Sequence, residues 1–237
     1  MYKMKRVLWF VVSVFMLSGC VGSDEGAKSK KMPTRFQSVP MGQAQLLQEG
    51  KEKMFCTVCG MTLPMFYKTN HSADVHGHTE QFCSIHCLAK TMNNNVDVKS
   101  PQVVNNETLK FMDAKKAWYV VGSSKAGTMS AVSKYAFEHK AKAEAFKKSF
   151  GGEVMDFEST LTLVKKGLEA ESNMIKKKQA MMIKKGEQMY ANLCEPTKEK
   201  FSSIASAKVF LKNNKSCGQL NGKQLQAMGL YLHSLNK

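Results

Sequence analysis

The chain has 237 residues, of which 43% are hydrophobic, enough for one compact core of ordinary size and a smaller element. Lysine and arginine number 35 against 19 aspartate and glutamate residues, so the formal net charge is +16. In an intracellular protein this charge would suggest nucleic acid as a partner, but the lysines lie in helical stretches without interleaved aromatic residues and the N-terminus indicates export. We therefore expect no nucleic-acid partner, and instead contact with anionic lipid or an acidic protein.

The N-terminus has the pattern of a secretory signal. Three basic residues precede an apolar run over 7–17, which has the charge and length of a signal peptide rather than of a membrane span. The run ends in Leu-Ser-Gly-Cys, the small-residue pattern that precedes the acylated cysteine of bacterial lipoproteins. We therefore predict a signal peptide over 1–19 and a lipid on Cys20, which would anchor the protein to a membrane of the bacterial cell envelope, facing the periplasm.

The rest of the chain divides into four segments by composition. Residues 20–53, rich in Lys, Ser, Gly and Gln, suit a lipid anchor and flexible tether. Residues 54–158 alternate strand patterns with turn signals and are the expected folded domain. Residues 159–185 repeat an apolar residue every seven positions with lysines between, which predicts a helical connector. Residues 186–237 form a small helical tail with a last helix over 222–235.

The expected fold class is α+β, because the folded domain reads as two tandem ββαβ units. The first unit has strands, a helix and a closing strand over 55–63, 79–83, 84–93 and 109–113. The second has the same order over 118–122, 130–137, 139–150 and 153–157. The long helix and the helical tail follow these two units.

Four cysteines in the first unit carry the chemistry. Cys56 and Cys59 form a CxxC, and a turn of this kind puts two sulfurs within reach of one metal ion. Cys83 and Cys87 are four residues apart at the start of the expected helix, so they lie on one face. The histidines of the intervening loop, such as His71, are further possible ligands.

The sulfur types leave the identity of the metal open. Four thiolates at this spacing suit a tetrahedral zinc site, whereas thiolates mixed with thioethers favour Cu(I), which is soft and tolerates low coordination. Met61, Met65 and Met129 offer such thioethers. A pair of disulfides is an alternative in an oxidising periplasm, and buried free thiols are another.

These motifs resemble the NosL family over about residues 54–158. The matching segments are Leu17 to Cys20, Cys56-Thr-Val-Cys59-Gly-Met61, Thr69-Asn70-His71, Phe82-Cys83-Ser84 with Cys87, Tyr119-Val-Val-Gly-Ser123, Gly127-Thr-Met129 and Ala136-Phe137. The family consists of copper-binding accessory lipoproteins that assist assembly of the copper centres of nitrous oxide reductase, with a fold of two related ββαβ units.

The resemblance implies a ligand set and a set of partners. Cu(I) would be held by Cys59, Met61 and Met129, and the partners would be nitrous oxide reductase or its assembly factors. This sequence departs from many relatives by adding three cysteines, Cys56, Cys83 and Cys87. A sulfur-rich or zinc-like site at the same place therefore stays open.

The tail is similar to the opening and closing helices of a c-type cytochrome domain. Cys194 is followed by Glu195 and not by a histidine that could ligate iron, so we expect no haem. We expect instead a helical tail with a possible disulfide between Cys194 and Cys217, which would stabilise it by about 3 kcal/mol.

The sequence predicts a binding protein rather than an enzyme. It contains no nucleophile elbow, phosphate-binding loop or catalytic carboxylate pair. The expected function is that of a membrane-anchored periplasmic Cu(I) chaperone. The alternatives are a zinc-stabilised scaffold or binding module, and a thiol redox protein that uses Cys56 and Cys59.

Overall fold

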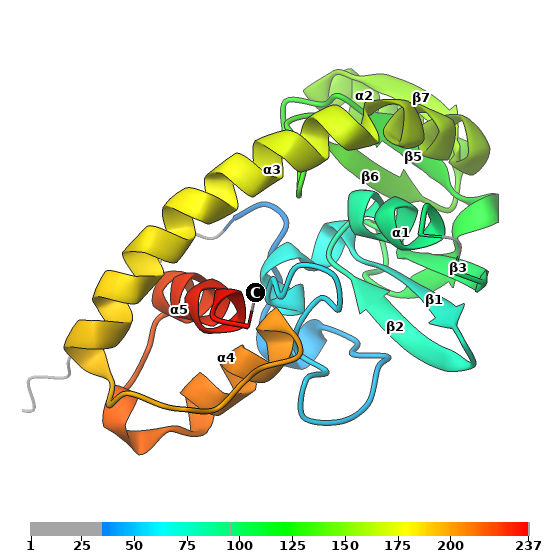
Figure 1. The fold of residues 1–237 in the computed structure, drawn as a ribbon. Helices are drawn as coiled ribbons and strands as arrows, with labels where there is room; N and C mark the ends of the chain where they lie inside the picture. The colour runs from blue at the N-terminus through cyan, green and yellow to red at the C-terminus, as the bar shows by residue number, and fades with distance from the viewer. Residues whose placement is uncertain (1–34, 95, 237) are drawn as a thin grey trace, which may run out of the picture. The chain divides into compact units, whose positions relative to one another are not determined.

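The structure is a computed structural model that describes residues 35–94 and 96–236 (Figure 1). The predicted signal peptide, Cys20 and the first part of the predicted tether lie outside these residues. From Arg35 onwards the chain lies against the folded domain, because the buried Gln37 and Gln48 hydrogen-bond to it. Within the described ranges, no helix has the length and hydrophobicity needed to cross a membrane.

The first half of the domain contains a four-stranded antiparallel sheet with the order β2-β1-β3-β4. Its elements are β1 (His71–Val75), β2 (His78–Phe82), α1 (Ile85–Met92), β3 (Val98–Val104) and β4 (Phe111–Asp113). His76 and Gly77 connect β1 to β2 with positive φ angles of 54° and 80°, the pattern of a two-residue type I′ hairpin turn. The hairpin delivers the chain directly into α1.

The second half contains a three-stranded antiparallel sheet with the order β6-β5-β7. Its elements are β5 (Trp118–Val121), β6 (Lys134–Phe137), α2 (Lys140–Phe150) and β7 (Glu153–Asp156). One face of β5 packs against α2, and the other faces the core that includes Ile85 of α1. Each half therefore contains the order ββαβ, and the α+β class with two such units is confirmed.

The first predicted strand, over 55–63, is wrong. That segment is a tight loop in which Phe55 and Thr62 form an isolated bridge, and it leads into a 3₁₀ helix, η2 (Leu63–Thr69). A strand cannot form here because Gly60 adopts a φ of +68° and its amide bonds back to the carbonyl of Cys56. The first strand is instead β1, in the segment expected to be a polar loop, and β3 was not predicted.

A single helix, α3 (Phe157–Leu193), spans 37 residues and leads from the domain into the tail. The carboxylate of Asp156 caps its N-terminus by accepting a hydrogen bond from the Ser159 amide at 2.7 Å. Its first turns bury apolar residues against α1 and both sheets. The helix continues without a break past Gly186, where the tail was expected to begin. At Gly186 an added Cβ would lie 2.1 Å from the carbonyl oxygen of Ala227, so this glycine permits close packing of the next helices.

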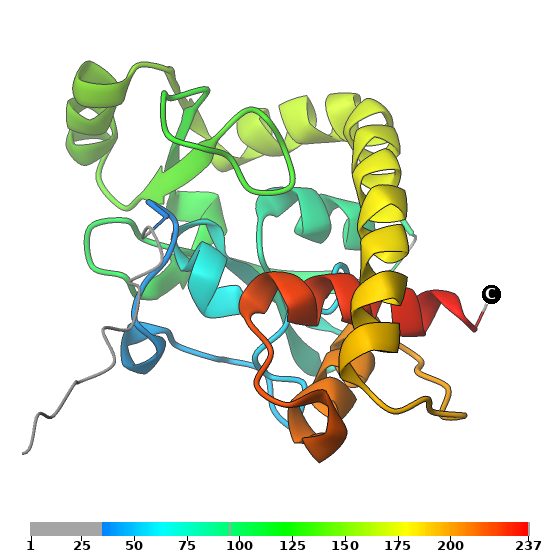
Figure 2. The same cartoon turned by 90° about the vertical axis from the view of Figure 1, so that its left-hand side faces the viewer.

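The tail consists of α4 (Ile204–Asn213), a short 3₁₀ turn η4 (Lys215–Cys217) and α5 (Gly222–Ser234). Both α-helices start with capping boxes, formed by Ser203 and Asn221. Figure 2 shows α5 beside the second half of α3, with which it packs. Phe55, from the loop of the first cysteines, belongs to the apolar core of the tail. The tail therefore packs directly against the cysteine-bearing loop.

Cys194 and Cys217 are joined by a disulfide, the pairing considered possible from the sequence. The two residues are 23 positions apart in the chain. The double variant Cys194→Ser/Cys217→Ser should lose about 3 kcal/mol of stability, because the unfolded chain regains the entropy of an open loop of this length. Denaturant unfolding of the metal-free protein under anaerobic conditions, without a reductant that would also cleave this bond, measures this loss. An unchanged unfolding midpoint would contradict a stabilising role for the bond.

Candidate metal centre

Four cysteine sulfurs converge in the interior of the first half. The Sγ atoms of Cys56, Cys59, Cys83 and Cys87 all lie within 4.8 Å of one another. Cys83 Sγ lies 3.5 Å from Cys59 Sγ and 3.7 Å from Cys87 Sγ. Bonds of about 2.3 Å to one tetrahedral ion would separate sulfurs by roughly 3.8 Å. The cluster therefore has the dimensions of sulfurs around a single ion, and its four residues are free cysteines that form no disulfides.

Two tight backbone features present the sulfurs to each other. The Cys56 amide donates to the carbonyl of Met61 at 2.9 Å, and the Gly60 amide donates to the carbonyl of Cys56 at 2.8 Å. This loop turns both thiols of the CxxC inward. Cys83 immediately follows β2 and precedes α1, whereas Cys87 lies in the first turn of α1. The two sulfurs are 3.7 Å apart, although only Cys87 is on the helix.

Burial and hydrogen bonds among the thiols give Cys56, Cys83 and Cys87 different pKa values. Burial raises the pKa of Cys56, but hydrogen bonds from the other three thiols to its thiolate outweigh this and hold the pKa well below its usual value. Burial and the same contacts raise the pKa of Cys83, and hydrogen bonds to Cys56 and Cys59 raise that of Cys87. The proton of Cys56 therefore leaves readily, whereas those of Cys83 and Cys87 do not unless a cation takes their place.

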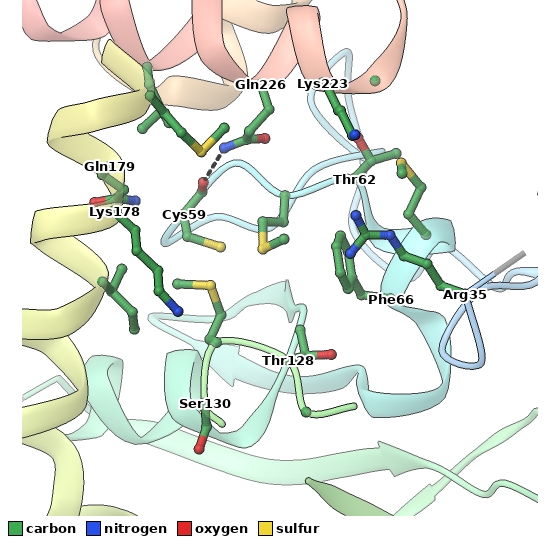
Figure 3. Close-up of a pocket in the computed structure, with 18 of the residues that line it drawn as sticks. Arg35, Cys59, Thr62, Phe66, Thr128, Ser130, Lys178, Gln179, Lys223 and Gln226 are labelled. Atoms are coloured by element: carbon green, nitrogen blue, oxygen red, sulfur yellow. Dashed lines mark hydrogen bonds between the residues drawn. The ribbon is translucent and has the colours of Figure 1, made fainter. Parts of the chain in front are cut away.

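Cys59 also lines a cavity of about 430 Å³ that is rich in methionine (Figure 3). The predicted thioether ligands Met61 and Met129 line the same cavity, as do three further methionines from η2 and α3. These are Met65, Met174 and Met182. The structure therefore places Cys59 between the buried thiols on one side and a group of thioethers on the other.

Met129 is held on this wall by a constrained loop. Its φ is +59°, an unusual value for a residue with a side chain. Gln37 donates to the carbonyl of Ala126 at 2.8 Å, and Thr69 donates to the hydroxyl of Thr128 at 2.8 Å. Contacts of the residues that precede Met129 thus support its strained backbone conformation.

The histidines near the cluster have other partners. His71 is buried between the carbonyl of Thr69 and the hydroxyl of Tyr119, each 3.1 Å from a ring nitrogen. Burial lowers the pKa of His71 to about 4, so its ring is neutral. His86 Nδ1 lies 2.9 Å from a carboxylate oxygen of Glu171 on α3. The histidines thus join the two halves of the domain and α3 rather than adding to the sulfur site.

Sequence reasoning missed two residues of the tail that contact the CxxC loop. Lys208 of α4 donates to the carbonyl of Gly60 at 2.5 Å, and Gln226 of α5 donates to the carbonyl of Cys59 at 3.1 Å. Burial lowers the pKa of Lys208 to about 7, against the opposing effect of negative charge on Cys59 and Cys56. The only signal in the sequence was a lysine within the apolar run of α4, in a chain where lysine is abundant.

Comparisons with known proteins agree with the resemblance seen in the sequence. The sequence model of the NosL family matches residues 48–162. A similar solved structure is the copper chaperone NosL from Shewanella denitrificans, with 26% sequence identity and a TM-score of 0.40. That match covers 50% of this chain and 96% of the other. The search of curated proteins returns no match.

The family match has clear limits along the chain. It ends within the first turns of α3, so most of that helix and the whole tail lie beyond it. It includes all four clustered cysteines as well as Met61 and Met129. Residues 48–162 of this chain are a NosL-family domain.

Proposed function

We propose that the protein is a membrane-anchored periplasmic chaperone that binds Cu(I) and delivers it for assembly of the copper centres of nitrous oxide reductase. One observation supports this most directly. A buried cluster of free thiols opens through Cys59 onto a cavity lined by methionine sulfurs. Copper is the cargo of such a protein and not a resident cofactor.

The donor atoms favour Cu(I) over harder ions. Thiolates and thioethers are soft ligands, and Cu(I) accepts two or three of them without a fixed geometry. An ion of this kind can exchange one sulfur for another in small steps, which suits uptake and release. Cys59 belongs to the cluster of four thiols and also lines the cavity with the methionine thioethers. It can therefore stay bound to the ion while the other sulfur ligands are exchanged.

A carrier fits this site better than an enzyme does. The clustered donor atoms are four cysteine sulfurs, and the neighbouring His86 is paired with Glu171 rather than with a thiol. The proposed partners are nitrous oxide reductase or its assembly factors, which would accept the ion. The lipid on Cys20 would keep the carrier at the membrane, since each buried methylene contributes about 0.8 kcal/mol.

A zinc-stabilised scaffold is the second candidate, and a specific observation favours it. All four sulfurs lie close enough together to surround one ion tetrahedrally. Such a site would not use the thioethers of Met61 and Met129. A thiol redox protein that uses Cys56 and Cys59 is a third possibility, and it would need no metal at all.

Competition between metals distinguishes the first two functions. The reduced protein should bind one Cu(I) far more tightly than Zn(II), measured against a chelator for each ion under anaerobic conditions. Binding should weaken as pH falls, because protons compete with the metal ion for the cysteine sulfurs that bind it. Zinc retention equal to or tighter than that of copper would support the scaffold instead.

Single substitutions show how much each sulfur contributes to Cu(I) affinity. Cys59→Ala should weaken Cu(I) binding by about a hundredfold or more, because it removes a thiolate from the centre of the site. Met61→Ala and Met129→Ala should weaken it less, by about tenfold, because a neutral thioether contributes less. The matched control is Met181→Ala, since Met181 is 60% exposed.

The Cys83→Ala/Cys87→Ala double variant tests the rival site. With Cu(I) held by Cys59, Met61 and Met129, this variant should still bind the ion with altered affinity. Loss of both Cu(I) and the fold would overturn the three-residue assignment, because structural four-cysteine sites couple metal binding to folding.

Localisation tests the proposed anchor. Cys20→Ala should leave an uncleaved or mislocalised precursor, because the thiol is the point of acylation. Mass spectrometry of the wild-type protein should find the mature N-terminus at Cys20 with an added acyl mass. A mature N-terminus elsewhere without an acyl group would exclude the anchor.

A further inference from the structure

Lys208 is a fully buried lysine with no acidic partner among the described residues. Its side chain is 0% exposed, and its ammonium donates to three neutral oxygens. These belong to Gly60, Thr62 and Gln226, at 2.5, 3.3 and 2.8 Å. None of the ion pairs found in residues 35–94 and 96–236 involves Lys208. The hydrogen bonds satisfy the three donors but leave the positive charge uncompensated, which is unfavourable in a buried site.

The cation lies against the loop that carries the first two cysteines. Gly60, whose carbonyl accepts its shortest bond, directly follows Cys59. The ammonium also sits 4.2 Å above the ring of Phe55, which directly precedes Cys56. Thiolates of this loop are therefore the nearby source of negative charge.

The fit between the tail and the loop is close enough to be specific. A Cβ on Gly60 would lie 2.4 Å from the side chain of Ile204 in α4. A Cβ on Gly229 would lie 2.5 Å from the stem of Lys208. Gln226 completes the contact, since it accepts from Lys208 and donates to the carbonyl of Cys59. Gly229 thus makes room for Lys208, and Gly60 makes room for Ile204, so that α4 packs closely on the loop of the first two cysteines.

We propose that the C-terminal helical tail is a built-in cap of the metal centre, in which Lys208 is a positioning residue that neutralises an anionic metal–thiolate centre. This inference rests on the proposed function, namely a metal at the cysteine cluster. Cu(I) with Cys59, Met61 and Met129 is neutral as long as Cys59 is the only thiolate. A second thiolate from Cys56, whose Sγ lies within 4.8 Å of that of Cys59, brings the net charge of the centre to −1, which one ammonium balances. A tail outside the family-matched residues thereby contributes to the affinity of the site.

Metal binding and the cap must then stabilise each other. The positive charge of Lys208 stabilises the Cu(I)-bound site, so bound Cu(I) stabilises the charged form of Lys208 by the same free energy, because coupling between two sites is reciprocal. In the metal-free protein the cation lacks its full counter-charge. Loading with Cu(I) should therefore raise the melting temperature of the full chain, and part of that rise should depend on Lys208.

The test compares Lys208→Met with Lys212→Met in the full-length reduced protein. Both remove one positive charge from α4, but Lys212 is exposed. Cu(I) affinity is measured by competition with a chelator, and the melting temperature is measured with and without Cu(I). The pH dependence of cysteine alkylation in the metal-free protein is the third readout.

Lys208→Met should bind Cu(I) about tenfold more weakly or worse, the usual effect of losing a partner that supports a metal ligand. Alkylation should shift to higher pH, because the thiolates lose a favourable neighbour. The metal-free variant should be as stable as the wild type or more so, because an apolar side chain replaces a buried unpaired charge. Lys212→Met should behave like the wild type in all three measurements.

Lys208→Gln provides a second test, since it keeps a donor toward Gly60 while removing the charge, and it should also weaken binding. Unchanged Cu(I) affinity and an unchanged alkylation profile in either folded Lys208 variant would overturn the inference. Absence of Cu(I) binding in the wild type would instead refute the proposed function, so the two failures are distinguishable.

Discussion

Repulsion among thiolates in a buried space is the constraint on which the rest of the site depends. Four sulfurs within 4.8 Å of one another cannot all be ionised without a cation among them. The fold brings them there through backbone that gives them little freedom, with Gly60 at a positive φ in the CxxC loop and the second pair at the junction of β2 and α1. The site is therefore built before any ion arrives, and its deprotonation accompanies binding.

Three different environments surround the cysteine cluster. On one side lies the apolar core of the first half, which excludes water. On another lies the cavity with its thioethers, reached through Cys59. A third side is formed by α4 and α5, which supply a cation and an amide to the same loop. In the proposed carrier, retention, exchange and charge balance would therefore fall to different parts of the chain.

The sequence predicted what depends on local spacing. The spacing predicted that Cys83 and Cys87 lie close together, although Cys83 precedes α1 rather than lying in it, and the second ββαβ unit followed from strand and turn patterns. The first strand was misplaced because the CxxC loop resembles a strand in its residue types, whereas β1 carries polar residues that are buried only through tertiary contacts, as His71 shows. Lys208 could not be predicted, since its partner Gly60 is 148 residues away. The chain has many solvent-exposed lysines, and only the tertiary structure shows that Lys208 is buried.

The position of Phe55 affects how the protein can be divided. Its ring belongs to the core of the tail, although the residue itself lies within the NosL-family match. Severing the chain after the matched residues would leave that ring and the surface around Gly60 in contact with water. The segment that relatives share is therefore smaller than the part of this protein that folds as one cooperative body. The cysteine-bearing loop and the tail are therefore not separable modules, since a residue of the loop is part of the core of the tail.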